Sequence, residues 1–229
     1  MFDFQFIKQF VRHVARGSVL KRQEMLRIGT LESSKCQDVI RLINSLEQDR
    51  KGKYYSNNSD FRVFNLDKVS NSNWIQDLGQ KYCPNGMYLG TILGSHLHSG
   101  PDTLGSGEGW HRDSWFGQHK VMIYLHDVDC NNGAFEYITG TSKLKSKIFD
   151  FFHGCNDRYN DKSVKFRKKD IVTYQGQAGD ILSFDPSGIH RGGTTVLSDR
   201  YSLTFYYFDN YVKKDQINAK FNQDNHELY

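Results

Sequence analysis

From residue 87 onward the spacing of hydrophobic positions changes, and this change divides the chain into two parts. In the first 85 residues apolar side chains recur at i, i+3, i+4 and i+7, which predicts a mostly helical segment. The expected apolar faces are Ile7, Phe10, Val11 and Val14; Val39, Leu42, Ile43 and Leu46; and Ile75, Leu78 and Tyr82. Such one-faced helices need an apolar surface to cover, so we expect them to support the second part.

Residues 87–209 contain short runs rich in β-branched and aromatic residues, separated by Gly, Asn, Asp and Pro. These runs are MYLGTIL, KVMIYLHDV, GAFEYI, DIVTYQG, GDILSF and RYSLTFYYF. Such a series predicts an antiparallel sandwich or small barrel. One helix near 141–156 is expected as an insert, with Leu144, Ile148, Phe151 and Phe152 on one side. Residues 210–229 form a polar tail, so the prediction is one mainly β domain with flanking helices.

The composition narrows the class of protein. The 229 residues suffice for one domain, and a net charge of +4 is too small to indicate nucleic-acid binding. No apolar run approaches the roughly 20 residues that span a bilayer, and the first residues do not resemble a signal peptide, so we expect a cytoplasmic protein without a membrane segment. The cysteines, at 36, 83, 130 and 155, form no CxxC pair and indicate neither a zinc knuckle nor a disulfide framework.

The stretch GWHRDSW at residues 109–115 carries the first chemical signal. On a β-strand, residues two apart point to the same face, so His111 and Asp113 would project together and Arg112 away. A third ligand is expected from another strand, and GDILSFDPSGIHRGG supplies His190. Two histidines and one carboxylate are the facial triad of non-haem iron(II) oxygenases, which leaves coordination positions open. A structural zinc site more usually has four protein ligands.

A second signal lies ten residues after His190. Alternation along RYSLTFYYF places Arg200, Ser202, Thr204 and Tyr206 on one polar face of a strand that belongs inside a sheet. This face must line a ligand-holding interior, because a buried guanidinium is costly without an anion. Arg200 can bind a carboxylate with two hydrogen bonds, and Ser202 can add a third. A small dicarboxylate that chelates the metal at its other end suits this arrangement.

Residues 108–209 resemble the phytanoyl-CoA dioxygenase-like branch of the iron(II)/2-oxoglutarate-dependent oxygenases. The resemblance is carried by WHRDSW, YLHDVDCNNGAFEYITGTS, GDILSFDPSGIHRGG and DRYSLTFYYF. It implies a double-stranded β-helix (jelly roll, cupin-like), with Fe(II) bound by His111, Asp113 and His190. It implies that Arg200 binds 2-oxoglutarate, that O2 is consumed, and that succinate and CO2 are released as a substrate C–H bond is hydroxylated.

Two positions depart from the family pattern. Lys143 follows GTS where members often have Gly-Ser-His, and Gly192 stands where they often have serine. Both departures affect secondary contacts to the co-substrate, not the triad. Related halogenases replace the carboxylate by a small residue, so the presence of Asp113 favours hydroxylation or a related oxidation.

Two other functions compete with oxidation of a small or medium-sized metabolite. A nucleic-acid demethylase of the same chemical class typically carries a second arginine six residues after the first, where this chain has Tyr206. A non-catalytic jelly-roll binding module predicts damage to the iron triad, and none is present. Substrate identity and oligomeric state are open.

His96 and His98 form a second His-x-His pair. Cupins place a glutamate three or four residues after such a pair, whereas the first glutamate here, Glu108, comes ten residues later. The sequence therefore favours a substrate contact from residues 97–109 over a metal role. The basic run at 162–170 is expected to be solvated.

Overall fold

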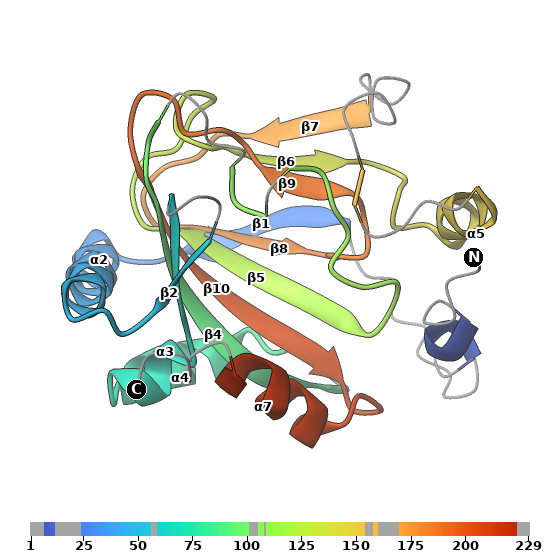
Figure 1. The fold of residues 1–229 in the computed structure, drawn as a ribbon, viewed down its shortest axis with the longest axis horizontal. Coiled ribbons are helices and arrows are strands. Elements are labelled where there is room, and N and C mark those ends of the chain that lie inside the picture. The colour runs from blue at the N-terminus through green and yellow to red at the C-terminus, as the bar shows by residue number, and fades with distance from the viewer. Residues whose placement is uncertain are drawn as a thin grey trace.

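Two antiparallel sheets pack against each other in the computed structural model, which describes residues 7–11, 24–55, 59–100, 105–107, 109–153, 158–159 and 170–223 (Figure 1). The larger sheet has the strand order β1-β8-β5-β10-β4-β3-β2, and the smaller has the order β7-β6-β9. The strands are β1 (Met25–Thr30), β2 (Lys53–Tyr55), β3 (Asp60–Phe64), β4 (Met87–Leu97), β5 (Gln118–Tyr124), β6 (Phe135–Ile138), β7 (Ile171–Tyr174), β8 (Asp180–Phe184), β9 (His190–Gly192) and β10 (Arg200–Asp209). The antiparallel two-sheet architecture predicted for residues 87–209 is confirmed.

Strand β10 lies between β5 and β4, and its two faces differ in polarity as the alternation predicts. Leu203, Phe205 and Tyr207 are buried in the apolar core on one face. Ser202 and Thr204 are buried on the other face, which lines a cavity between the sheets. The sheets meet beside this cavity through a second apolar cluster that includes Tyr124 and Leu182 from the larger sheet and Phe135 and Tyr137 from the smaller.

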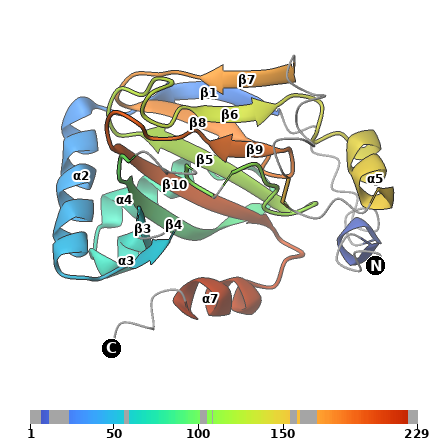
Figure 2. The same ribbon diagram turned by 45° about the horizontal axis from the view of Figure 1, so that its top comes forward.

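Helices cover the outer face of the larger sheet (Figure 2). They are α2 (Ser33–Gln48), α3 (Leu66–Val69) and α4 (Asn73–Lys81). Val39, Ile43 and Ile75 pack in the same core as Leu203 and Phe205. The predicted faces of the second and third helices therefore support the sheet.

The first 85 residues differ from their mostly helical prediction, because β1, β2 and β3 lie within them. β1 and β2 are the edge strands of the larger sheet, so pairing with a neighbour on one side decides their structure. Partly exposed edge strands need no continuous apolar face, and β1 is mostly exposed, so the hydrophobic pattern gives no strand signal there. Of the first predicted helix, residues 7–11 are helical, while Val14 lies outside the described residues.

Two further segments also differ from expectation. The inserted helix is present as α5 (Leu144–Phe152), but its predicted apolar face is largely exposed, at Leu144, Ile148 and Phe152. Its buried residues are Lys147, Asp150 and Phe151. Phe151 packs in an aromatic cluster with Phe116, Lys147 lies over the Phe116 ring, and Asp150 pairs with Arg112. The predicted polar tail contains α7 (Lys214–Gln223), which packs Phe221 into an aromatic cluster with Phe64 and Phe208.

No helix among the described residues is long and apolar enough to cross a membrane. Cys36, Cys83 and Cys130 are free thiols, and Cys155 lies outside the described residues.

Candidate metal centre

His111, Asp113 and His190 converge at one end of the cavity between the sheets. Each offers one ligand atom, and these atoms lie within 4.8 Å of one another. His111 Nε2 is 3.7 Å from Asp113 Oδ1, and His190 Nε2 is 3.5 Å from Asp113 Oδ2. The side chains of His111 and Asp113 point toward the same site, as predicted. However, His111 forms only an isolated β-bridge to His190 and does not lie in a regular strand.

Backbone contacts aim both imidazoles at the same point. His111 and His190 exchange two backbone hydrogen bonds, with N···O distances of 2.9 and 3.0 Å. The Nδ1 of His111 is 2.8 Å from the Gly109 carbonyl, and that of His190 is 2.9 Å from the Gly188 carbonyl. A carbonyl only accepts, so each Nδ1 carries the proton and each Nε2 keeps a lone pair, as in metal-binding histidines.

The charges at this site also suit a cation. Burial, with His190 close by, lowers the pKa of His111 to about 3, so its ring is neutral. Burial opposes ionisation of Asp113, but Lys120 and the two histidines hold the pKa of this carboxyl well below its usual range. A neutral imidazole and an ionised carboxylate are the protonation states that bind a metal.

Lys120 also belongs to this site, although the hydrophobic pattern of the sequence does not predict it there. It lies in β5, is buried, and places Nζ 2.7 Å from Asp113 Oδ2 and 4.1 Å from the centre of the Tyr206 ring. Its only sequence signal is a lysine in a strand whose residues are all buried. A buried ammonium requires a partner, and this one uses the carboxylate of the triad.

Arg112 points away from the triad, as predicted, and holds the segment in place. Its guanidinium donates to the Asp150 carboxylate and to the Thr141 and Ser187 carbonyls, and its Nε donates to the Tyr159 hydroxyl at 2.8 Å. Asp150 comes from α5, so this buried ion pair ties the inserted helix to the metal segment. It also explains why Asp150 lies on the buried side of α5.

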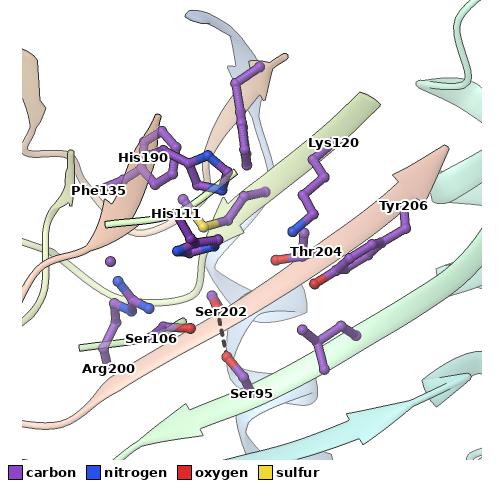
Figure 3. A pocket seen from close by; sticks show the side chains of 14 residues that line it. Ser95, Ser106, His111, Lys120, Phe135, His190, Arg200, Ser202, Thr204 and Tyr206 are labelled. Carbon is purple, nitrogen blue, oxygen red and sulfur yellow. Dashed lines mark hydrogen bonds between the residues drawn. The ribbon is translucent and has the colours of Figure 1, made fainter. Parts of the chain in front are cut away.

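Arg200 lies in the same cavity, as predicted. Figure 3 shows it with Ser202, Thr204 and Tyr206 along β10, facing the two histidines and Lys120. Arg200 is 2% exposed, and no described carboxylate forms an ion pair with it. Its Nη1 donates to the Gly133 carbonyl, while its Nε has no hydrogen-bond partner among the described residues. A buried, unpaired guanidinium indicates a site for an anion.

The remaining predicted contacts have specific environments. Ser202 Oγ is 2.9 Å from Ser95 Oγ, so Ser95 is a further hydroxyl at the cavity. A Cβ added at Gly192 would lie 2.8 Å from both Nη atoms of Arg200, so this departure from the family pattern makes room for the guanidinium. The other departure, Lys143, is the exposed N-cap of α5.

The second histidine pair does not reach this cavity. His96 and His98 lie with Glu47 and Asp199 in a separate cluster toward α2. Residues 101–104 and 108 of the neighbouring loop, and 162–169 of the basic run, lie outside the described residues.

The sequence of residues 27–200 matches the phytanoyl-CoA dioxygenase (PhyH) family. The chain belongs to this family. No curated protein matches its sequence closely enough to identify a nearer relative.

Solved structures confirm the jelly-roll fold of this family member. The epimerase SnoN, solved in complex with Fe3+, alpha ketoglutarate and nogalamycin RO, is 14% identical with a TM-score of 0.60, over 89% of this chain and 83% of SnoN. HygX from Streptomyces hygroscopicus, solved with nickel and 2-oxoglutarate, is 16% identical with a TM-score of 0.60, over 90% of this chain and 88% of HygX. AviO1 from Streptomyces viridochromogenes is 15% identical with a TM-score of 0.56, over 93% of this chain and 99% of AviO1.

Proposed function

We propose that this member of the phytanoyl-CoA dioxygenase family is an iron(II)/2-oxoglutarate-dependent dioxygenase that oxidises a C–H bond of a small or medium-sized metabolite. One observation carries the proposal: two histidines and a carboxylate converge beside a buried arginine that forms no ion pair with any carboxylate in the described part of the chain. A structural metal site has no need of such an arginine, whereas a chelating dicarboxylate uses both features. SnoN and HygX, which share the fold and were solved with a metal and 2-oxoglutarate, support the same reading.

His111, Asp113 and His190 would hold the iron through the two Nε2 atoms and one carboxylate oxygen. Bound iron, with 2-oxoglutarate and O2, supplies the oxidising power, and succinate and CO2 are released. Arg200 binds the distal carboxylate of 2-oxoglutarate, and Ser202 is placed to add a hydrogen bond. Three protein ligands leave the coordination positions that the co-substrate and O2 need.

The substrate is a polar metabolite. Lys120, Thr204 and Tyr206 line the cavity together with His111 and His190, and they offer an ammonium and two hydroxyls. Lys120 has donors beyond the one directed at Asp113, and a hydroxyl can both donate and accept, so these groups suit a ligand with hydroxyl, carbonyl or anionic groups. Tyr206 also stands where a nucleic-acid demethylase carries its second arginine, which favours a metabolite over nucleic acid.

The test is succinate formation from 2-oxoglutarate with iron(II), ascorbate and air. We expect activity in the wild type and a loss of at least about 100-fold in His111→Ala and in Arg200→Ala, with the exposed-residue variant His153→Gln as the matched control. Succinate formed equally by all variants would rule out this site. Product analysis with candidate metabolites then separates hydroxylation from epimerisation, the reaction named for SnoN.

A further inference from the structure

A second cluster of metal-binding side chains lies on the outer face of the larger sheet. Neighbours in a strand point to opposite faces, so Ser95 reaches the cavity while His96 points toward α2. In β4 His96 pairs with Tyr201 of β10, and the two rings stack with centroids 4.0 Å apart. His98, one residue after the end of β4, places its ring 3.9 Å from that of His96. The His-x-His pair therefore faces the helix layer, away from the cavity.

The carboxylate that the sequence lacked nearby comes from the last turns of α2. Glu47 Oε2 is 2.7 Å from His96 Nδ1, and Glu47 Oε1 is 2.7 Å from His98 Nε2. The three residues present ligand atoms within 4.8 Å of one another, as do those of the triad. Glu47 lies 49 positions before His96 in the sequence, so only the packing of α2 on the sheet reveals this arrangement.

Further contacts orient the ligands. Asp199 Oδ2 is 2.9 Å from His96 Nε2, so each ring nitrogen of His96 faces a carboxylate oxygen. A metal bound at Nδ1 would replace the proton between Nδ1 and Glu47, while Nε2 would still donate to Asp199. The backbone N–H and hydroxyl of Ser99 donate to the other oxygen of Asp199, at 2.7 and 2.8 Å. The Tyr54 hydroxyl donates to Glu47 at 2.7 Å. Histidines that bind a metal typically donate their second N–H to a carboxylate in this way.

Charge and access also suit a cation. Two carboxylates, those of Glu47 and Asp199, lie against the His96 and His98 rings. His96 is 6% exposed at its side chain, whereas His98 is 36% exposed, so the cluster is reached from solvent at one side.

We propose that Glu47, His96 Nδ1 and His98 Nε2 bind a second divalent ion, Zn²⁺, separate from the triad. Zinc takes such mixed nitrogen and oxygen ligands at about 2.0–2.2 Å, with tetrahedral ligand atoms roughly 3.3 Å apart. Zinc binding would therefore widen both 2.7 Å contacts, from Glu47 Oε2 to His96 Nδ1 and from Glu47 Oε1 to His98 Nε2, by about 0.6 Å. Water completes the coordination, and the ion joins α2 to β4 next to the segment that leads into Arg200.

Zinc stoichiometry after equilibrium dialysis of the metal-free full-length protein tests the proposal. We expect two ions per chain in the wild type and in the control His153→Gln. We expect one ion per chain in His190→Ala, which loses the triad site, and one in His98→Gln and Glu47→Gln. Asp199→Asn should keep the second site but weaken it about 10–100-fold, because Asp199 only orients a ligand. One ion in the wild type, lost in His190→Ala and retained in His98→Gln, would show a hydrogen-bonded network without metal and overturn the proposal.

A measurement without cluster substitutions guards against misfolded variants. Cobalt(II) added to His190→Ala should give the visible absorption of a tetrahedral ion, and zinc should displace it. Absence of that absorption in a folded His190→Ala protein also overturns the second site. Neither outcome depends on turnover, so the iron centre and the zinc cluster are judged separately.

Discussion

The ion pair between Lys120 and the triad carboxylate gives the sharpest prediction, because it makes stability depend on the metal. In the metal-free protein Lys120 Nζ, which is buried and 2.7 Å from Asp113 Oδ2, is the cation that balances this partly buried carboxylate. Removing one partner of a buried pair costs about 3–5 kcal/mol. For a chain of this size, roughly 2–4 °C of melting temperature accompany each kcal/mol. Metal-free Lys120→Met should therefore melt about 6–20 °C below the wild type.

A bound divalent ion changes this result. It supplies positive charge to Asp113 in place of the ammonium, and in the variant it is no longer repelled by Lys120. Mn²⁺ can replace iron(II) without redox chemistry. At saturating Mn²⁺ the difference in melting temperature between Lys120→Met and the wild type should fall to less than about half of its metal-free value. The metal-induced rise in melting temperature is therefore larger in Lys120→Met than in the wild type.

Thermal unfolding with chelator and with Mn²⁺ checks this prediction. Lys145→Met, which removes an exposed lysine of α5, is the matched control. Its melting temperature should differ from that of the wild type by no more than about 2 °C, both with chelator and with Mn²⁺. If Lys120→Met melts below the wild type by the same amount with and without metal, a bound metal does not take over the role of Lys120 at Asp113, and the prediction is refuted.

Four further predictions concern individual contacts. Asp113→Ala should weaken iron(II) binding at neutral pH by removing the anionic ligand; unchanged iron stoichiometry would contradict this. Arg200→Lys should raise the KM for 2-oxoglutarate about 10-fold or more while changing the iron requirement little, since lysine cannot form the two-pronged contact, whereas equal losses would make Arg200 structural. Tyr207→Phe should lower the free energy of unfolding by about 1–2 kcal/mol in urea titrations, because the buried hydroxyl donates to the Gly79 carbonyl at 2.8 Å; no change would mean that water replaces the contact. Folding lowers the pKa of Asp199 from an ordinary 3.8 to about 2, so its ionised carboxylate stabilises the folded protein above pH 3.8. This contribution is lost as the pH falls through 2, so the free energy of unfolding of the metal-free wild type should decrease more between pH 5 and pH 2 than that of Asp199→Asn.

Residues on one strand or one short segment were predictable from the sequence. His111 and Asp113 are two apart, and Arg200 to Tyr206 alternate along β10, so local backbone geometry alone decides which side chains share a face. His190 was expected from another strand because a facial triad needs a third ligand. The helices around Val39 and Ile75 followed from spacing at 3.6 residues per turn.

Contacts between distant segments were decided only by the tertiary structure. β1 and β2 form through pairing at the edges of the larger sheet, which no local hydrophobic pattern encodes. Lys120 meets Asp113 because β5 lies beside the metal segment, and Glu47 meets His96 and His98 because α2 packs on the sheet. The periodicity of one helix or strand predicts which of its faces a side chain occupies. The partner of that side chain across the core depends on how whole helices and strands pack, which no local sequence pattern specifies.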